Sequence, residues 1–160
     1  MKLTKNFNLK EFTKSAGITI IPTDEQIFCI KTLCLNLLQP IRDKFGTVTI
    51  SSGLRNKESN DMLIKQGYQA SFTSDHLAWC TANPKGTGAA DFYCKGISLP
   101  VVFQWAQDNL INNIGQIIYY PDKGFIHISN SWESIFKCPI LVKKEKVLIN
   151  KNGKFIPYKN

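Results

Sequence analysis

Apolar side chains recur at three- and four-residue steps after residue 26, and this spacing predicts a long amphipathic helix. The stripe consists of Ile27, Ile30, Leu33, Cys34, Leu37, Leu38, Ile41 and Phe45. Thr23 and Gln26 precede it as a capping box, in which each side chain accepts the backbone N–H of the other residue. Pro40 is expected to kink or interrupt the helix because it lacks an N–H, and Gly46 is expected to end it.

Shorter patterns predict the elements on either side. A second capping box, Asn8 with Glu11, opens a short helix. Further helices are expected at residues 57–66, closed by Gly67, and at residues 99–109, capped by Ser98. The inner face of the last helix is expected to carry Val102, Trp105, Ala106 and Leu110. Residues 48–51 and 89–93 are short β-branched or apolar runs, which are typical of strands.

A hairpin is expected late in the chain. Residues 116–120 and 125–129 are rich in β-formers, and Pro121-Asp122-Lys123-Gly124 between them has the chemistry of a turn. Early helices, followed by strands that alternate with helices and end in a hairpin, predict the α+β fold class. We expect a small, mostly antiparallel sheet with flanking helices, and the length of 160 residues suits a single domain.

Composition narrows the class of protein. A hydrophobic share of 43% excludes a disordered chain, and no apolar run approaches the roughly 18 residues of a membrane-spanning helix. The N-terminal segment lacks the features of a secretory signal. The net charge of +8 is compatible with an anionic partner such as nucleic acid, a cell-wall polymer or an acidic membrane surface, although a solvated basic face is the simpler explanation. Much of the excess lies in residues 143–160, which we interpret as a basic C-terminal extension of the same domain.

Cysteine usage points to a reducing compartment. The five cysteines are scattered and form no Cys-x-x-Cys pair, which excludes a zinc ribbon and a thioredoxin-like motif. Unpaired, buried thiols are the plain interpretation, and they indicate synthesis in a cytoplasm. These residues are Cys29, Cys34, Cys80, Cys94 and Cys138.

Three residues are candidates for a metal site. Asp91 lies within an apolar strand, where a carboxylate is costly unless it is paired, hydrogen-bonded or bound to a metal. The chain has two histidines, His76 in a polar loop and His127 in a predicted strand. Two imidazoles and one carboxylate, with a fourth position left open, are a typical ligand set of catalytic zinc. From the residues alone, the alternative of ordinary core or surface histidines remains open.

The order of several segments resembles the D-Ala-D-Ala carboxypeptidase-like zinc peptidases, and above all the small single-domain members carried by bacteriophages. The segments are LTKNFNLKEFTKSA, PTDEQI, LLQPIRDKFG, TVTISSGLR, SDH, GAADF, GQIIYY and FIHIS. They extend from about residue 3 to about residue 130. The resemblance implies a Hedgehog/D,D-peptidase fold and a peptidase domain at residues 1–142, followed by the extension at 143–160.

The resemblance also implies roles for individual residues. The family's zinc ligands fall on His76, Asp91 and His127. Its active-site arginine falls on Arg55, whose forked guanidinium suits a carboxylate or an oxyanion, although a surface salt bridge is the simpler alternative. Ser74 matches the Ser of the family's Ser-x-His and is expected to orient the first ligand or to contact substrate.

Two departures from the family pattern affect the transfer of function. His76 and Asp91 are 15 residues apart, farther than in the family's His-x-x-Gly-x-Ala-x-Asp, and Thr87 stands where members carry Gly. The extra residues predict either a substrate-contacting lip that includes Trp79 or a neutral loop extension. At the position of an acid in many phage members the chain has Tyr120. If that acid is the general base, the role is lost or has moved. Asp122 in the predicted turn is the candidate replacement, with Tyr120 as a hydrogen-bond donor, and the alternative is that Asp122 only forms the turn.

The sequence therefore predicts a zinc-dependent peptidase that hydrolyses peptidoglycan stem peptides, as a D,D-carboxypeptidase or an endopeptidase. The resemblance implies a phage lytic or wall-remodelling protein, made in the host cytoplasm and acting at the bacterial cell wall. The alternative is a zinc-bearing but catalytically impaired module that binds wall peptide or has a structural role. A nucleic-acid partner is not expected, because no helix-turn-helix, RNA-binding or zinc-finger signature is present.

Overall fold

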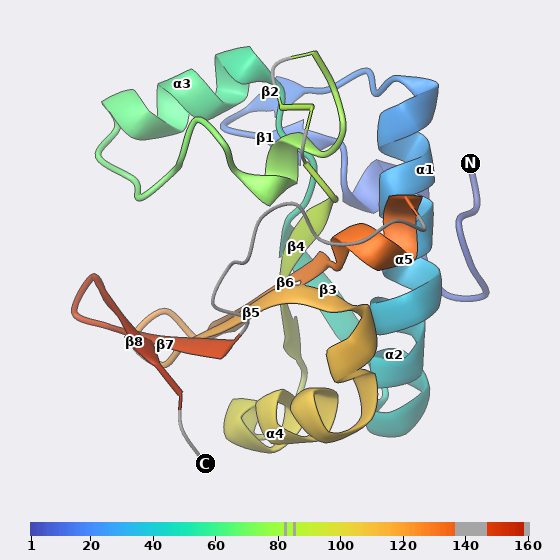
Figure 1. Ribbon diagram of the computed structural model, residues 1–160, viewed down its shortest axis with the longest axis vertical. Helices are drawn as coiled ribbons and strands as arrows, with labels where there is room; N and C mark the ends of the chain where they lie inside the picture. The colour runs from blue at the N-terminus through green and yellow to red at the C-terminus, as the bar shows by residue number, and fades with distance from the viewer. Residues whose placement is uncertain (82, 85, 137–146, 159–160) are drawn as a thin grey trace.

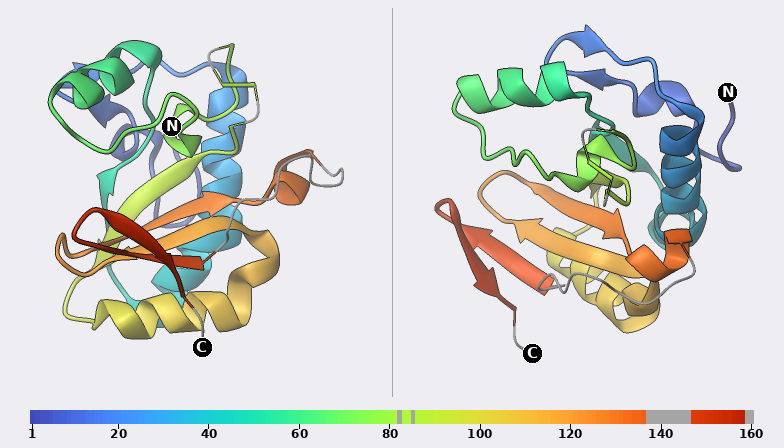
Figure 2. Two further views of the ribbon diagram at one scale, coloured as in Figure 1. Left: turned by 60° about the vertical axis from the view of Figure 1, so that its left-hand side comes forward. Right: turned by 45° about the horizontal axis from the view of Figure 1, so that its top comes forward.

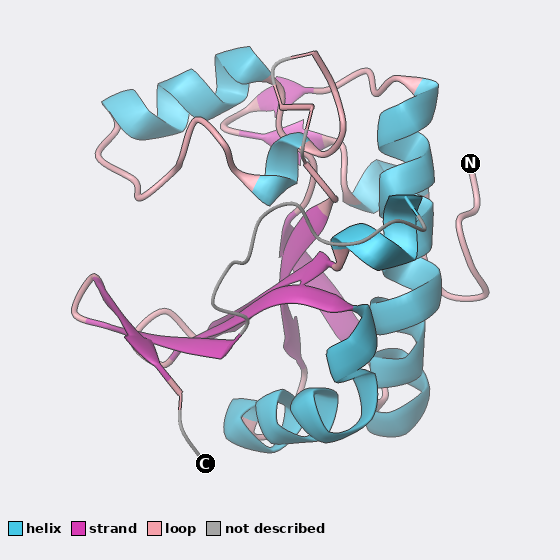
Figure 3. Cartoon of the chain, viewed as in Figure 1, coloured by secondary structure: helices cyan, strands magenta, loops and turns pink. Residues whose placement is uncertain are grey.

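A mixed β-sheet forms the centre of the computed structural model, which describes residues 1–81, 83–84, 86–136 and 147–158 (Figure 1). Over these residues the sheet has six strands in the order β3-β4-β6-β5-β7-β8, and a separate antiparallel pair, β1-β2, lies beyond the main sheet (Figure 3). The strands are β1 Lys14–Ser15, β2 Ile18–Thr19, β3 Val48–Ser52, β4 Ala89–Cys94, β5 Ile114–Tyr120, β6 Phe125–Asn130, β7 Val147–Lys151 and β8 Lys154–Pro157. The prediction of an α+β domain is confirmed. The sheet is also mostly antiparallel, because among its neighbouring pairs only β5 and β7 run parallel.

Helices cover the sheet and flank it. The α-helices are α1 Asp24–Leu33, α2 Gln39–Phe45, α3 Lys57–Lys65, α4 Leu99–Leu110 and α5 Trp132–Phe136, and single 3₁₀ turns occupy Leu9–Glu11, Asp75–Leu77 and Ile111–Asn113. Helices α1, α2 and α4 contact strands of the sheet, whereas α3 lies apart from them, near β1 and β2 (Figure 1). Among the described residues, no helix has both the length and the apolar character that crossing a bilayer requires.

The predicted long helix is built with an internal irregularity. Its capping box forms as expected, since the Thr23 hydroxyl accepts the N–H of Gln26 and the Gln26 side chain accepts the N–H of Thr23. Between α1 and α2, residues 34–38 form a π-helical turn in which the N–H of Gln39 reaches back to the carbonyl of Cys34. This turn accommodates Pro40, which would clash with a carbonyl in a regular helix. Gly46 ends the helix with a φ of 83°, as predicted.

Two details of the predicted helix at residues 99–109 differ from the structure. Phe103 is buried on the inner face, and Trp105 is only partly buried, where its ring packs edge-on against Phe45 at the border of the core. Ser98 occupies the N-cap position, but its side chain makes no capping hydrogen bond. Helical spacing alone does not distinguish a residue at the centre of a buried face from one at its border.

The C-terminal residues join the sheet. Within the basic extension, β7 pairs in parallel with β5, and β8 folds back on β7 (Figure 2). The expected boundary between residues 142 and 143 lies outside the described residues. The hydrophobic core encloses three of the predicted free thiols, Cys29, Cys34 and Cys94, while Cys80 is partly exposed and Cys138 lies outside the described residues.

Candidate metal centre

Cross-strand pairing brings Asp91 and His127 together. Asp91 in β4 is directly opposite His127 in β6, and His127 is in turn opposite Ile118 in β5. Residues opposite each other in neighbouring strands project from the same face, so these three side chains form a row across the middle of the sheet. On the other face, alternate residues such as Ala90, Ile117 and Ile128 belong to the hydrophobic core.

A tightly held loop supplies His76. Ser74 caps the 3₁₀ turn Asp75–Leu77, and its hydroxyl accepts the N–H of His76 at 3.4 Å. The carbonyl of His76 accepts the N–H of Arg55 at 2.8 Å, which ties the turn to the segment after β3. The imidazole itself is oriented by a 2.6 Å hydrogen bond between its Nδ1 and the carbonyl of Gly53. Metal-binding histidines are commonly oriented in this way through their second ring nitrogen.

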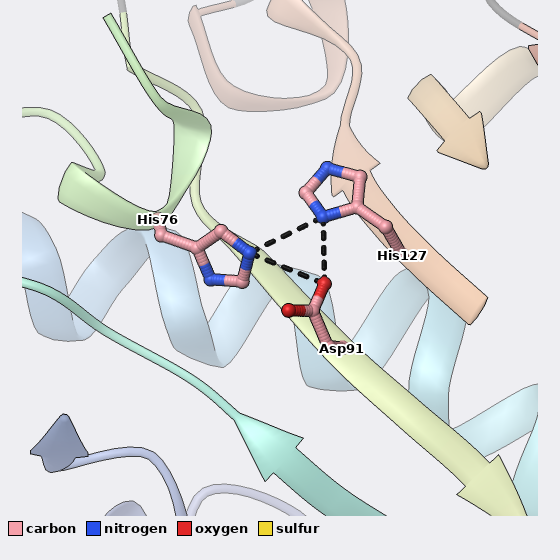
Figure 4. Close-up of side chains that lie close together, drawn as sticks. All are labelled: His76, Asp91 and His127. Atoms are coloured by element: carbon pink, nitrogen blue, oxygen red, sulfur yellow. Dashed lines mark hydrogen bonds and ion pairs between the residues drawn. The ribbon is translucent and has the colours of Figure 1, made fainter. Parts of the chain in front are cut away.

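The three side chains converge on one point (Figure 4). Oδ1 of Asp91 lies 2.9 Å from Nδ1 of His127 and 3.3 Å from Nε2 of His76, and the two nitrogens are 3.2 Å apart. Because Nδ1 of His76 donates to Gly53, its Nε2 presents a lone pair. A hydrogen on Nδ1 of His127 satisfies the carboxylate but leaves that lone pair facing a negatively charged oxygen. A cation between the three atoms removes the repulsion.

Burial determines the charge state of these groups. Desolvation lowers the pKa of His76, which favours the neutral imidazole that a metal requires. Burial would raise the pKa of Asp91, but positive charge on His76 and a hydrogen bond from His127 hold that pKa well below its usual range. A cation bound between the three groups supplies the same positive charge when both imidazoles are neutral. Two imidazoles and an ionised carboxylate, all buried and within 4.8 Å of one another, form a site that could hold a metal ion.

A guanidinium lies beside this group. Nη2 of Arg55 is 3.9 Å from Oδ2 of Asp91 and 3.4 Å from the hydroxyl of Ser52. Burial lowers the pKa of Arg55, and the negative charge of Asp91 opposes that shift. Since an arginine pKa starts above 12, the side chain keeps its charge. The ion pair is longer than a hydrogen bond, so the charged fork is not fully engaged by protein atoms of the described residues.

The site opens into a cavity of about 760 Å³, lined by Arg55, His76, Asp91 and His127 at one end. Tyr120 also lines the cavity, and its ring stacks on Phe125 at 4.5 Å between ring centroids. Burial, and then the charge of Asp91, raise the pKa of Tyr120 to about 12. The phenol is therefore protonated at neutral pH and can donate a hydrogen bond.

The predicted site residues divide into two groups. Arg55, Ser74, His76, Asp91, Tyr120 and His127 all line the cavity. Asp122 does not, because it lies at the exposed tip of the β5–β6 hairpin and accepts the N–H of Asn152 at 3.3 Å. Trp79 also lies outside the cavity, with 39% of its surface exposed. The structure therefore does not bring Asp122 or Trp79 to the three candidate ligands.

Sequence reasoning did not identify several residues around the site. The carbonyl of Gly53 orients His76, and the Gly position itself is required because a Cβ there would lie 2.5 Å from the backbone of Phe12. The Ser-Gly-x-Arg segment contains this glycine, so its signal was present in the sequence. Asp75 and Phe155 also line the cavity. Phe155 carried no signal, because it enters the cavity through pairing of strands far apart in the chain.

Comparison of the chain with protein-family models, with curated proteins and with solved structures found no match in any of the three. The resemblance to the D-Ala-D-Ala carboxypeptidase-like peptidases consequently rests on the motifs of the chain alone.

Proposed function

We propose that the protein is a zinc-dependent peptidase that hydrolyses peptide bonds in peptidoglycan stem peptides. The observation that carries this proposal is the convergence of His76, Asp91 and His127 at one end of a cavity, with the Arg55 guanidinium beside them. The choice of peptidoglycan as substrate rests on the order of the motifs in the sequence, which also suggests action at a bacterial cell wall as part of a phage lytic or remodelling process.

The spacing of the ligand atoms suits zinc. A tetrahedral ion with bonds of about 2.0–2.1 Å places its ligand atoms about 3.3 Å apart. The three separations here are 2.9, 3.2 and 3.3 Å. When bound, zinc supplies a Lewis acid that polarises a carbonyl and lowers the pKa of water towards neutrality.

Arg55 is suited to hold negative charge next to this site. Its guanidinium is permanently charged and lies along the cavity wall beside Asp91. A forked donor of this kind binds a carboxylate or a developing oxyanion through two hydrogen bonds, whereas a lysine offers only a point charge. We assign Arg55 the stabilisation of negative charge on the substrate.

Tyr120 complements this role as a neutral donor. Its phenol keeps its proton at neutral pH, because burial raises its pKa to about 12. Stacking on Phe125 and edge contact with Phe155 at 6.3 Å restrict the ring to one orientation. We assign its hydroxyl a hydrogen bond to a substrate oxygen and not the role of a base.

A second candidate function is favoured by the presence of Tyr120, because a phenol with a raised pKa does not act as a general base at neutral pH. Asp75 and Asp91 are the acidic residues among the described lining residues of the cavity, and Asp91 is a candidate ligand. If Asp75 does not accept a proton, the chain is a zinc-bearing module that binds wall peptide without efficient hydrolysis. Turnover separates the two functions, since both require the metal.

The test combines metal analysis with turnover of a stem pentapeptide. We expect one zinc per chain and release of a peptide product, both lost in His127→Ala. Asp122→Asn serves as a control for zinc content, because Asp122 is exposed and outside the cavity. Wild-type protein that binds no zinc, or a His127→Ala variant that binds it as tightly as wild type, would contradict the proposed centre. Zinc without turnover would favour the binding module.

A further inference from the structure

Aromatic rings line the part of the cavity that extends from the metal centre towards the β7–β8 hairpin. We call Tyr68, Tyr120, Phe125 and Phe155 the aromatic wall; all four line the cavity. Tyr120 and Phe125 are opposite each other in β5 and β6, and Phe155 in β8 is opposite Asn150 in β7. The β7–β8 hairpin extends the sheet beyond β5 (Figure 2), and Phe155 lines the cavity from this extension.

Two rings of the aromatic wall are exposed although they line a cavity. Tyr68 exposes 61% of its surface and Phe155 exposes 47%. Phe155 and Tyr120 pack at nearly a right angle, at 6.3 Å between ring centroids, and this contact leaves almost half of the Phe155 surface exposed. Exposed aromatic side chains that cluster in a concave site mark a binding surface more often than an accident of packing.

Polar groups border the aromatic wall and hold it in place. Gln69 donates to the carbonyl of Gly153 at 2.8 Å and accepts from the side chain of Asn150 at 3.5 Å, which joins the loop after α3 to the hairpin. Nζ of Lys123 lies 5.5 Å from the centroid of the Tyr120 ring. The site thus offers aromatic rings with an amide at their border and an ammonium group over the ring of Tyr120.

From this combination we infer that the aromatic wall is a subsite for a saccharide ring of the substrate, with Phe155 as a specificity-determining residue. The C–H groups of a pyranose ring pack on the negative face of an aromatic ring, and its hydroxyl and acetamido groups hydrogen-bond at the border. An aliphatic side chain would use the rings but not the amide or the ammonium group. The inference rests on the proposed function, in which the stem peptide is attached to an amino-sugar chain.

Strand β8 provides a matched pair of variants. Phe155 and Ile156 are adjacent and equally exposed, at 47% each, but only Phe155 lines the cavity. Neighbouring residues in a strand project from opposite faces, so Ile156→Ala controls for the loss of an apolar side chain from the hairpin.

The experiment compares a stem pentapeptide with the same pentapeptide carrying its amino-sugar disaccharide. With wild-type protein we expect the sugar to lower KM by about fivefold, the scale of one good aromatic contact. Phe155→Ala is expected to remove this preference, and Ile156→Ala to retain it. A wild-type protein without preference for the sugar, or a Phe155→Ala variant that keeps it, would overturn the inference.

A binding measurement separates this inference from the proposed activity. Calorimetry with the same two ligands reports affinity whether or not either is cleaved, and we expect the same preference and the same response to Phe155→Ala. Tighter binding of the sugar-bearing peptide without turnover would contradict the peptidase but uphold the saccharide subsite. Equal affinity for the two ligands would contradict the subsite, whatever the activity.

Discussion

The two ends of the cavity are built in different ways. At the metal end, Asp91 and His127 come from β4 and β6, each of which has a paired neighbour on both sides. His76 joins them from a loop. Hydrogen bonds to Gly53, Arg55 and Ser74 hold this loop in place. At the aromatic end, Phe155 comes from an edge strand and Tyr68 from a loop, and both rings are exposed.

This difference matches what each end is proposed to do. Metal ligation and charge stabilisation depend on separations fixed to a fraction of an ångström, and the central strands and the bonded loop provide this. Contact with a ring-shaped ligand tolerates small shifts, because the energy is spread over many weak atom pairs. We therefore expect substitutions at the metal end to remove metal or turnover, and substitutions of Tyr68 or Phe155 at the aromatic end to change KM.

The largest effect is expected from His127→Ala. The variant loses one of three protein ligands, and this should weaken zinc binding by far more than the roughly 10–100-fold that is typical when a group supporting a ligand is lost. Competition with a chelator measures the affinity, and circular dichroism checks that the sheet is intact. Unchanged affinity would show that the metal, if bound, lies elsewhere.

Arg55→Ala should lower turnover by about 10²–10³-fold, the range found when an oxyanion donor is removed. Zinc content should not change, because Arg55 lies 3.9 Å from Asp91 and is not a ligand. Arg55→Lys is the informative control, since a point charge cannot reproduce the fork and should restore little activity. A fully active Arg55→Ala enzyme would indicate that Arg55 forms only a structural salt bridge.

A smaller effect is expected for Tyr120→Phe, which removes the hydroxyl but keeps the ring on Phe125. The loss of one neutral donor should lower kcat by about tenfold and leave zinc content unchanged. Steady-state kinetics test this. If Tyr120→Glu instead raises activity sharply, the tyrosine replaces a base that the chain has lost, and the binding module becomes the better description.

The smallest effect is expected for Asp122→Asn. A general base at this position would make turnover fall by at least about 10²-fold. The exposed position of Asp122, at the hairpin tip and outside the cavity, predicts a change of less than about twofold, because the group does not reach the site. Progress curves with the stem pentapeptide distinguish the two outcomes, and a large loss with unchanged zinc content would reinstate Asp122 as the base.

Local chemistry made much of the fold predictable. The Thr23–Gln26 capping box, the turn at residues 121–124 and Gly46 each specify a backbone conformation within a few residues. The sequence also indicated the candidate ligands, because an Asp within an apolar strand is unusual and the chain has only two histidines. The spacing alone did not show their convergence, because 51 positions separate His76 from His127, and the resemblance to the zinc peptidases was what implied it.

Two other features had to come from the structure. Asp122 precedes His127 by five residues, and a strand rises about 3.3 Å per residue, so the turn carries it along the sheet and away from the ligands. Phe155 lies in a segment whose lysines and asparagines suggest a tail. Only the parallel pairing of β7 with β5 turns that segment into a wall of the cavity.

The same hairpin has a consequence for how the molecules behave toward one another. Strand β5 has seven residues, and without β7 its backbone N–H and C=O groups would form an open edge to which a strand of another molecule could add. The edge that the described structure presents instead is β8, a four-residue strand that begins with the charged Lys154 and ends with Pro157, which has no N–H to donate. Pairing with β7 thus covers the long edge of β5, and the short strand β8 that forms the edge in its place discourages strand addition between molecules.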